Sequence, residues 1–288
     1  VAGPKSAQNT LPTALLVARR FGGHVDALHI RVDPMRQLMI ADETMIPSRL
    51  QELENVQINI TERARAARAA FDMWLADNQV ALRDDPPDAG APDAGGPAAG
   101  AVSASWDDIT GTEADEVARR GGAYDLIVAD MALARARDAS RDALESALFS
   151  TGRPALLAPP EPPAQLGETI LLGWNRTAQS ARTVQGAMPL LERAKRVVVL
   201  MVATGAKEGP GPGEIARTLA WHGIKTEVRE IEPDRRSVGQ ILLEDATAVQ
   251  ADLLVMGAYS HSRWREKILG GVTKYVIDHA DLPVFLAH

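Results

Sequence analysis

Short apolar runs that end at small or turn-forming residues recur near the C-terminal end of the chain. The runs Asp252–Gly257 and Leu282–Ala287 are rich in aliphatic residues and too short for helices. Such runs are typical of strands buried on both faces of a sheet. Between them, the segment Gly271–Asp278 has apolar residues at three- and four-residue spacing, which predicts a helix. This region therefore predicts a strand, a loop, a helix and a strand.

The same order of elements occurs earlier in the chain. A run at Asp125–Ala129 is followed by a helical pattern at Arg141–Phe149 and by a second run at Arg153–Ala158. Asp125 corresponds to Asp252 and Pro154 to Pro283, and these two pairs are separated by almost the same length of chain. A separation that is nearly constant indicates a duplication.

The remainder of the second half alternates strand and helix. The predicted strands are Thr169–Gly173, Arg196–Val202 and Lys225–Ile231, and the predicted helices are Thr177–Leu191, Glu214–His222 and one from Ser237 with Gln240 in a capping box. Alternation of this kind predicts parallel β-α-β units and a doubly wound sheet. In the first half, His24–Ile30 matches the strand at Arg196–Val202, at a wider separation than the other matched pairs. The first half is therefore the longer copy.

The extra length lies between the matched segments. Ser48–Asn78 has the apolar spacing of a long amphipathic helix, with Ser48 at its predicted start. Asp84–Gly100 is rich in Pro, Gly, Ala and Asp and lacks the apolar content to pack, so we expect a mobile loop without a function of its own. Pro159–Gly167 is the expected linker, which gives a first domain at 1–160 and a second at 167–288.

Composition narrows the class of protein. The 288 residues are 45% hydrophobic and 24% charged, with no apolar run long enough to cross a membrane. The net charge of −7 disfavours nucleic acid as a partner. Zero cysteines exclude disulfides and thiolate chemistry and suit a cytoplasmic location. Val1-Ala2-Gly3 reads as the end of a strand, so we expect that most of a first strand precedes it, and no secretory signal is visible.

A glycine-containing segment carries the candidate chemistry. The strand that ends at Gly257 is followed by a loop, and Gly270 and Gly271 open the next helix. Glycines allow the backbone to approach phosphate oxygens, and a helix N-terminus offers N–H donors and partial positive charge. The segment Gly257–Thr273 is therefore a candidate anion site.

This segment resembles the universal stress protein family. Members carry Gly-x2-Gly-x9-Gly-Ser/Thr after the fourth strand, and this chain reads Gly257-x2-Ser260-x9-Gly270-Gly271. The flanking strands also look like that family, and the chain is identified as a member of the tandem, two-domain type. The resemblance implies two Rossmann-like, adenine nucleotide α-hydrolase-like domains, and a stress-response or signalling function with ATP or another adenine nucleotide bound. Magnesium is expected only together with ATP.

The resemblance also implies the positions of the nucleotide contacts. The acidic position after the first strand falls on Asn175, and the second-strand contact falls on Val202. The phosphate-contacting residues fall in the glycine segment and are Gly257, Ser260, Arg263, Gly270, Gly271, Val272 and Thr273.

Three departures from the family pattern predict weak binding. Asn175 lacks the charge of a carboxylate, Ser260 adds a Cβ where glycine is usual, and Gly271 lacks a hydroxyl.

The first half departs further from the pattern. Its strand ends in Ala129-Asp130-Met131, no glycine follows this strand until Gly152, and Asp130 places negative charge where phosphate would lie. We expect this half to act as a structural partner, with the two halves paired through Pro154–Ala158 and Pro283–Ala287. A homodimer is a further option.

Alternative functions remain open from the sequence. No hydrolase, kinase or metal-site motif is present, so enzymatic activity beyond slow ATP hydrolysis is not expected. The alternative to a nucleotide-binding module is a nucleotide-free interaction or dimerisation scaffold. An adenylating enzyme would need a Ser-Gly-Gly-x-Asp-Ser loop, and Trp174–Thr177 replaces it in the second half.

Overall fold

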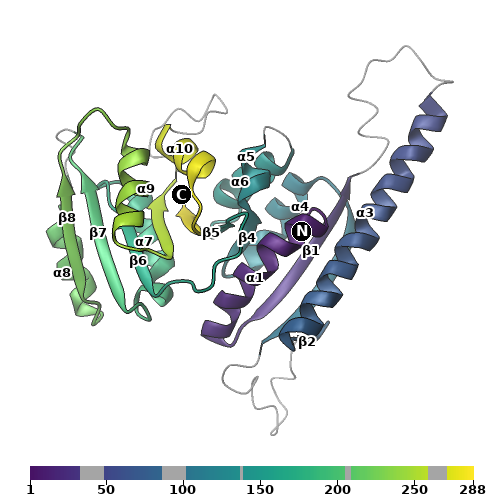
Figure 1. Cartoon of the computed structure of the whole chain (residues 1–288), viewed down its shortest axis with the longest axis horizontal. Helices are drawn as coiled ribbons and strands as arrows, with labels where there is room; N and C mark the ends of the chain where they lie inside the picture. The colour runs from purple at the N-terminus through teal and green to yellow at the C-terminus, as the bar shows by residue number, and fades with distance from the viewer. Residues whose placement is uncertain (33–48, 86–101, 137–138, 205–208, 259–270) are drawn as a thin grey trace, which may run out of the picture. The chain divides into compact units, whose positions relative to one another are not determined.

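The computed structural model describes residues 1–32, 49–85, 102–136, 139–204, 209–258 and 271–288 (Figure 1). The chain forms two compact units, Val1–Glu116 and Val117–His288. Within the described residues, no helix is long and apolar enough to cross a membrane.

The first unit combines a small parallel sheet with two long helices. Its elements are α1 (Pro4–Phe21), β1 (His24–Val32), α3 (Arg49–Asn78), β2 (Ala81–Leu82) and β3 (Ser103–Gly111), and α4 (Glu113–Arg120) follows them. The sheet has the order β1-β3-β2, and both pairings are parallel. Helix α3 packs against α1 and β1 and buries Phe71 and Trp74 against Ala104 of β3. These contacts form a separate core for the first unit.

The second unit is built around a seven-stranded sheet. Its elements are η1 (Gly121–Ala123), β4 (Ile127–Asp130), α5 (Met131–Arg135), α6 (Ala139–Ser150), β5 (Ala155–Ala158), β6 (Thr169–Gly173), α7 (Ala178–Leu191), β7 (Arg196–Val202), α8 (Pro212–Trp221), β8 (Thr226–Ile231), α9 (Val238–Ala248), β9 (Leu253–Gly257), α10 (Gly271–His279) and β10 (Val284–Ala287). The strand order is β4-β5-β10-β9-β6-β7-β8. The fold is therefore mixed α/β with parallel β-α-β units, as the alternation predicts.

The pairing predicted between the two apolar last strands is confirmed. β5 and β10 pair antiparallel, with Phe285 opposite Leu156 and Leu286 opposite Ala155. All four residues of each strand are buried. All other pairs of neighbouring strands described in this sheet are parallel. The pairing of β5 with β10 removes an apolar edge from each strand.

Other predictions differ from the structure in their details. Strand β3 and helix α5 were not predicted. Helix α8 begins and ends slightly earlier than expected, whereas α9 has the predicted capping box of Ser237 and Gln240. The compact units do not follow the repeat, because β4 and β5, expected in the domain 1–160, pair into the sheet of the second unit. Most of Asp84–Gly100 lies outside the described residues.

Candidate nucleotide site

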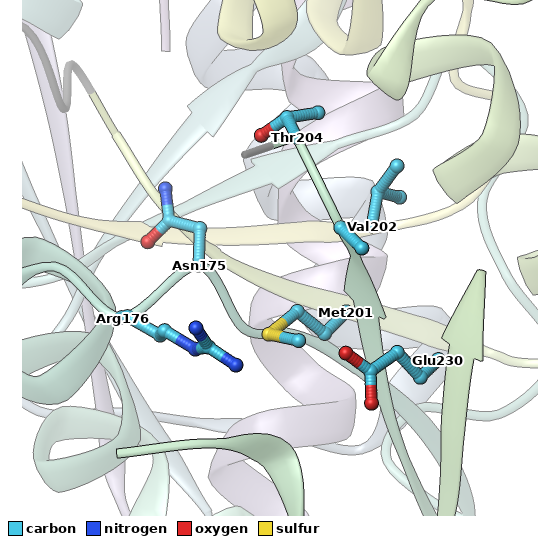
Figure 2. A pocket seen from close by; sticks show the side chains of 7 residues that line it. Asn175, Arg176, Met201, Val202, Thr204 and Glu230 are labelled. Carbon is cyan, nitrogen blue, oxygen red and sulfur yellow. The ribbon is translucent and has the colours of Figure 1, made fainter. Parts of the chain in front are cut away.

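A pocket lies in the second unit where strands β6 and β7 end at the carboxyl edge of the sheet. Its volume is about 160 Å³. The residues that line it come from the ends of β6, β7 and β8 and are Asn175, Arg176, Met201, Val202, Ala203, Thr204 and Glu230 (Figure 2). In doubly wound sheets, ligands bind outside the carboxyl ends of the strands. The location of the pocket is therefore that of a ligand site.

The segment between β6 and α7 is held at both of its ends. The Trp174 backbone N–H donates to the Leu200 carbonyl at 2.8 Å, and the indole N–H donates to the Pro210 carbonyl at 2.8 Å. Thr177 then caps α7 by accepting from the Ser180 amide. Because Trp174 and Thr177 are fixed, the two residues between them have a defined position at the pocket.

Asn175 has one side of its amide already engaged. The Thr177 hydroxyl donates to Asn175 Oδ1 at 2.6 Å. This bond orients the amide, so its –NH₂ is the group best placed to meet a ligand. A carboxylate at this position would present acceptors only, and Asn175 therefore changes the polarity of this wall as well as its charge.

Arg176 has left-handed backbone geometry, with φ of 60°. A non-glycine residue in this region costs about 1–2 kcal/mol. The other described non-glycine residues with positive φ, Gln79 and Gln250, each lie just past a helix C-terminus, where this conformation is common. Arg176 instead lies between a strand and a helix, so the end of a helix does not explain its conformation.

Two glycines of the segment before α8 make room for Arg176. A Cβ at Gly209 would lie 3.3 Å from Arg176 Cβ, and Gly209 has φ of 133°, which favours glycine. A Cβ at Gly211 would lie 3.7 Å from an Arg176 guanidinium nitrogen. Gly209 and Gly211, which belong to the glycine- and proline-rich segment 209–213, therefore lie against Arg176.

The opposite wall comes from β7 and β8. The Ala203 amide donates to the Ile231 carbonyl at 2.9 Å, and the Thr204 amide donates to the Val202 carbonyl at 2.9 Å, which turns the chain at the strand end. Met201 and Val202 supply apolar surface, and Glu230 of β8 supplies a carboxylate. The wall thus combines an apolar face with one negative charge.

The predicted site residues divide into three groups. Asn175 and Val202 line the pocket. Gly257, Gly271, Val272 and Thr273 are described but do not line it, and Ser260, Arg263 and Gly270 lie outside the described residues. Their roles in binding phosphate stay predictions.

Gly257 has a packing role that the structure explains. A Cβ at this position would lie 2.8 Å from the Ser180 backbone nitrogen and 3.0 Å from the Gln179 carbonyl carbon. Backbone atoms of α7 do not move aside cheaply, so only glycine fits at the end of β9. At Gly271, by contrast, a Cβ would meet nothing within 4 Å.

Sequence reasoning missed five of the pocket residues, namely Arg176, Met201, Ala203, Thr204 and Glu230. The first four lie next to Asn175 or close to Val202 in the sequence, so the carboxyl ends of the predicted strands gave a usable signal for them. Glu230 also lies next to the carboxyl end of a predicted strand, Lys225–Ile231, but an exposed glutamate in an outer strand is ordinary and was not distinguished. Among the described residues, no cluster of potential metal ligands occurs.

The fold and the pocket define a doubly wound α/β protein with a ligand crevice at the carboxyl edge of its sheet. The family model of the universal stress protein family matches residues 202–288. No curated protein matches the sequence.

Solved structures show the extent of the likeness. A universal stress protein from Archaeoglobus fulgidus aligns with a TM-score of 0.55 and 14% identity over 96% of this chain and 93% of its own. A universal stress protein from Pseudomonas aeruginosa aligns with a TM-score of 0.49 and 13% identity, and the alignment covers 94% of each chain. One from Lactobacillus plantarum covers 43% of this chain and 99% of its own, at 0.31 and 20%. The first of these supports the fold.

Proposed function

We propose that residues 167–288 form a nucleotide-binding stress-response or signalling module with weak affinity for ATP or another adenine nucleotide. The observation that carries the proposal is the pocket. Asn175, at the position implied for a ribose or adenine contact, and Val202, at the position implied for the second-strand contact, line it together. The proposal includes a tandem partner in the first half and a cytoplasmic location, which the lack of cysteines suits.

The dimensions and chemistry of the pocket support weak binding. Its 160 Å³ is below the roughly 300–1,000 Å³ typical of ligand pockets, so it has room for a ring system rather than a whole nucleotide. Phosphates would then extend toward the segment after Gly257. Asn175 contributes no negative charge to a ribose contact, and each 1.4 kcal/mol lost is about tenfold in affinity.

The first half contributes no second site in this proposal. Asp130, at the repeat position of Gly257, is buried and accepts from the Ala132 amide as the N-cap of α5. A carboxylate engaged in this way serves the fold and disfavours phosphate at this position.

Calorimetry on one variant tests the proposal. The triple variant Asn175→Asp, Ser260→Gly and Gly271→Ser restores the family pattern, and Gly271 has open space for a side chain. We expect ATP with magnesium to bind the wild type at roughly 0.1–1 mM and the triple variant about 10-fold tighter or more. Gly213→Ser, which adds a hydroxyl at another open helix start, is the matched control and leaves the affinity unchanged.

Two results would contradict the proposal. Micromolar binding by the wild type would show that the three departures do not weaken the site. Absence of binding in both proteins would favour the alternative, a nucleotide-free scaffold that acts through its surface or through a homodimer. Trp221, which is 83% exposed on α8, is the residue to replace in tests of that alternative.

A further inference from the structure

Two opposite charges reach into the pocket from different elements. Figure 2 shows the Arg176 guanidinium and the Glu230 carboxylate on opposite sides, with Met201 between them. Arg176 follows β6, and Glu230 belongs to β8. The pocket thus offers a set of N–H donors on one side and two acceptor oxygens on the other.

The strand order indicates which part of a nucleotide these charges would meet. β9, which leads into the glycine segment, lies on one side of β6, and β7 and β8 lie on the other. The Arg176 guanidinium is close to Gly211 before α8, on the side of β7 and β8. A nucleotide with its phosphates toward the glycine segment would therefore place its base against Arg176 and Glu230.

The backbone of Arg176 supports a role in recognition. Its left-handed conformation is not explained by the end of a helix, and strained residues of this kind cluster at binding sites. A guanidinium stays charged at all physiological pH values and presents donors in a planar fork. Such a fork suits two adjacent acceptors on a planar ligand.

Guanine matches this pair of charges better than adenine. Its O6 and N7 are adjacent acceptors that arginine binds in bidentate fashion, and its N1–H and 2-amino groups are adjacent donors for one carboxylate. Adenine has a single donor group, its 6-amino group, and it has no second donor beside it for the carboxylate. Adenine would therefore leave the Glu230 carboxylate, which is exposed on β8, without a pair of adjacent donors from the base.

We propose that this pocket prefers guanine over adenine, with Glu230 facing N1–H and the 2-amino group, and with Arg176 facing O6 and N7. This inference rests on the proposed nucleotide site and specifies its base. A guanine preference would also weaken ATP binding through the mismatch at the base, in addition to the departures at Asn175 and in the glycine segment.

Monophosphates isolate the base from the phosphate contacts. In calorimetry on the whole chain at one salt concentration, we expect GMP to bind at least about 10-fold more tightly than AMP. Inosine monophosphate, which lacks the 2-amino group, and 7-deaza-GMP, which lacks N7, should each lie between them. Inosine monophosphate tests the contact with Glu230, and 7-deaza-GMP tests the contact with Arg176.

A conservative substitution tests the role of Glu230. Glu230→Gln removes one of two acceptors and adds a donor, so GMP should weaken about 10-fold while xanthosine monophosphate, with N1–H beside a carbonyl, should gain. If Glu230 had only a structural role, the substitution would not weaken GMP binding and strengthen xanthosine monophosphate binding at the same time. Glu227→Gln, on the same strand but paired with Arg196 outside the pocket, is the control and should leave both affinities unchanged.

The possible results separate the two proposals. AMP binding as tightly as GMP, or no exchange between guanine and xanthine in Glu230→Gln, would overturn the guanine preference and leave the nucleotide site standing. Failure of every nucleotide to bind would overturn both proposals.

Discussion

Asp130 at the end of β4 and Gly257 at the end of β9 occupy the same position in the two repeats but meet different surroundings. The Asp130 side chain is buried and caps a helix that starts at once. Gly257 has no space for a side chain, because the backbone of α7 lies against it. The comparison teaches that the glycine of the apparent nucleotide motif is required by packing, whether or not a phosphate binds nearby.

The largest effect that tests this comparison is expected at Gly257. Gly257→Ala would force a methyl group against backbone atoms at 2.8 and 3.0 Å, and overpacking of this kind costs about 1–3 kcal/mol of unfolding free energy. Urea denaturation measures the loss. Asp130→Ala, which removes the N-cap of α5, should cost about 1 kcal/mol. Equal stability of Gly257→Ala and wild type would show that α7 adjusts and that packing does not fix the glycine.

An effect of similar size is expected at Arg135, which links the helix after β4 to the helix before β10. Its guanidinium donates to the Ile277 carbonyl at 2.8 Å and to the Ala280 carbonyl at 2.6 Å, at the C-terminal end of α10. Arg135→Met keeps much of the side-chain volume and should cost about 1.5–3 kcal/mol by urea denaturation, as for other hydrogen bonds to charged groups.

The control for Arg135 is a second arginine in the following helix. Arg141 pairs with Glu145 one helical turn away, at 3.7 Å. Arg141→Met should cost about 0.5 kcal/mol or less. A loss at Arg135 no larger than the loss at Arg141 would show that the link between α5 and α10 does not stabilise the second unit.

The smallest effect is expected at His29. In the first repeat this residue occupies the position that Met201 occupies in the second. Burial lowers the pKa of His29 below its ordinary value of 6.5, although its hydrogen bond to the Val1 carbonyl opposes this shift. As the pH falls below 6.5, the unfolded chain therefore binds a proton at this histidine before the folded chain does, and the free energy of unfolding decreases. Above pH 6.5 the contribution is fully present.

Urea denaturation at pH 7.5 and 5.5, followed by tryptophan fluorescence, measures this dependence. His29 stacks on Trp106 with ring centroids 5.8 Å apart. His29→Met should reduce the loss of stability on acidification, and His24→Met, on an exposed residue of the same strand, is the control for the substitution itself. An unchanged pH dependence in His29→Met would assign the acid sensitivity to other groups.

The sequence predicted more of the fold than of the candidate site. The matching separations of Asp125 from Asp252 and of Pro154 from Pro283 located the duplicated strands. The family resemblance, together with the apolar character of these strands, predicted the pairing of β5 with β10 correctly. β3 was missed although Ala104 alternates with polar residues, because two acidic residues follow Trp106 and weaken the apolar pattern.

The pocket was predictable only in part, for a physical reason. Residues next to a strand end can be placed from the strand itself, as for Asn175 and Val202. Glu230 reaches the pocket because β8 lies beside β7, and the left-handed turn at Arg176 depends on contacts with Gly209. Such features arise from tertiary packing, which local residue patterns do not encode.

The antiparallel seam between β5 and β10 also determines the order in which the second unit can form. Leu157 faces Val284, so the strand that covers β5 is synthesised long after β5 itself. Until then β4 and β5 present an apolar edge that can pair wrongly with other chains. Because closure joins such distant segments, we expect this half of the sheet to form late and slowly during folding.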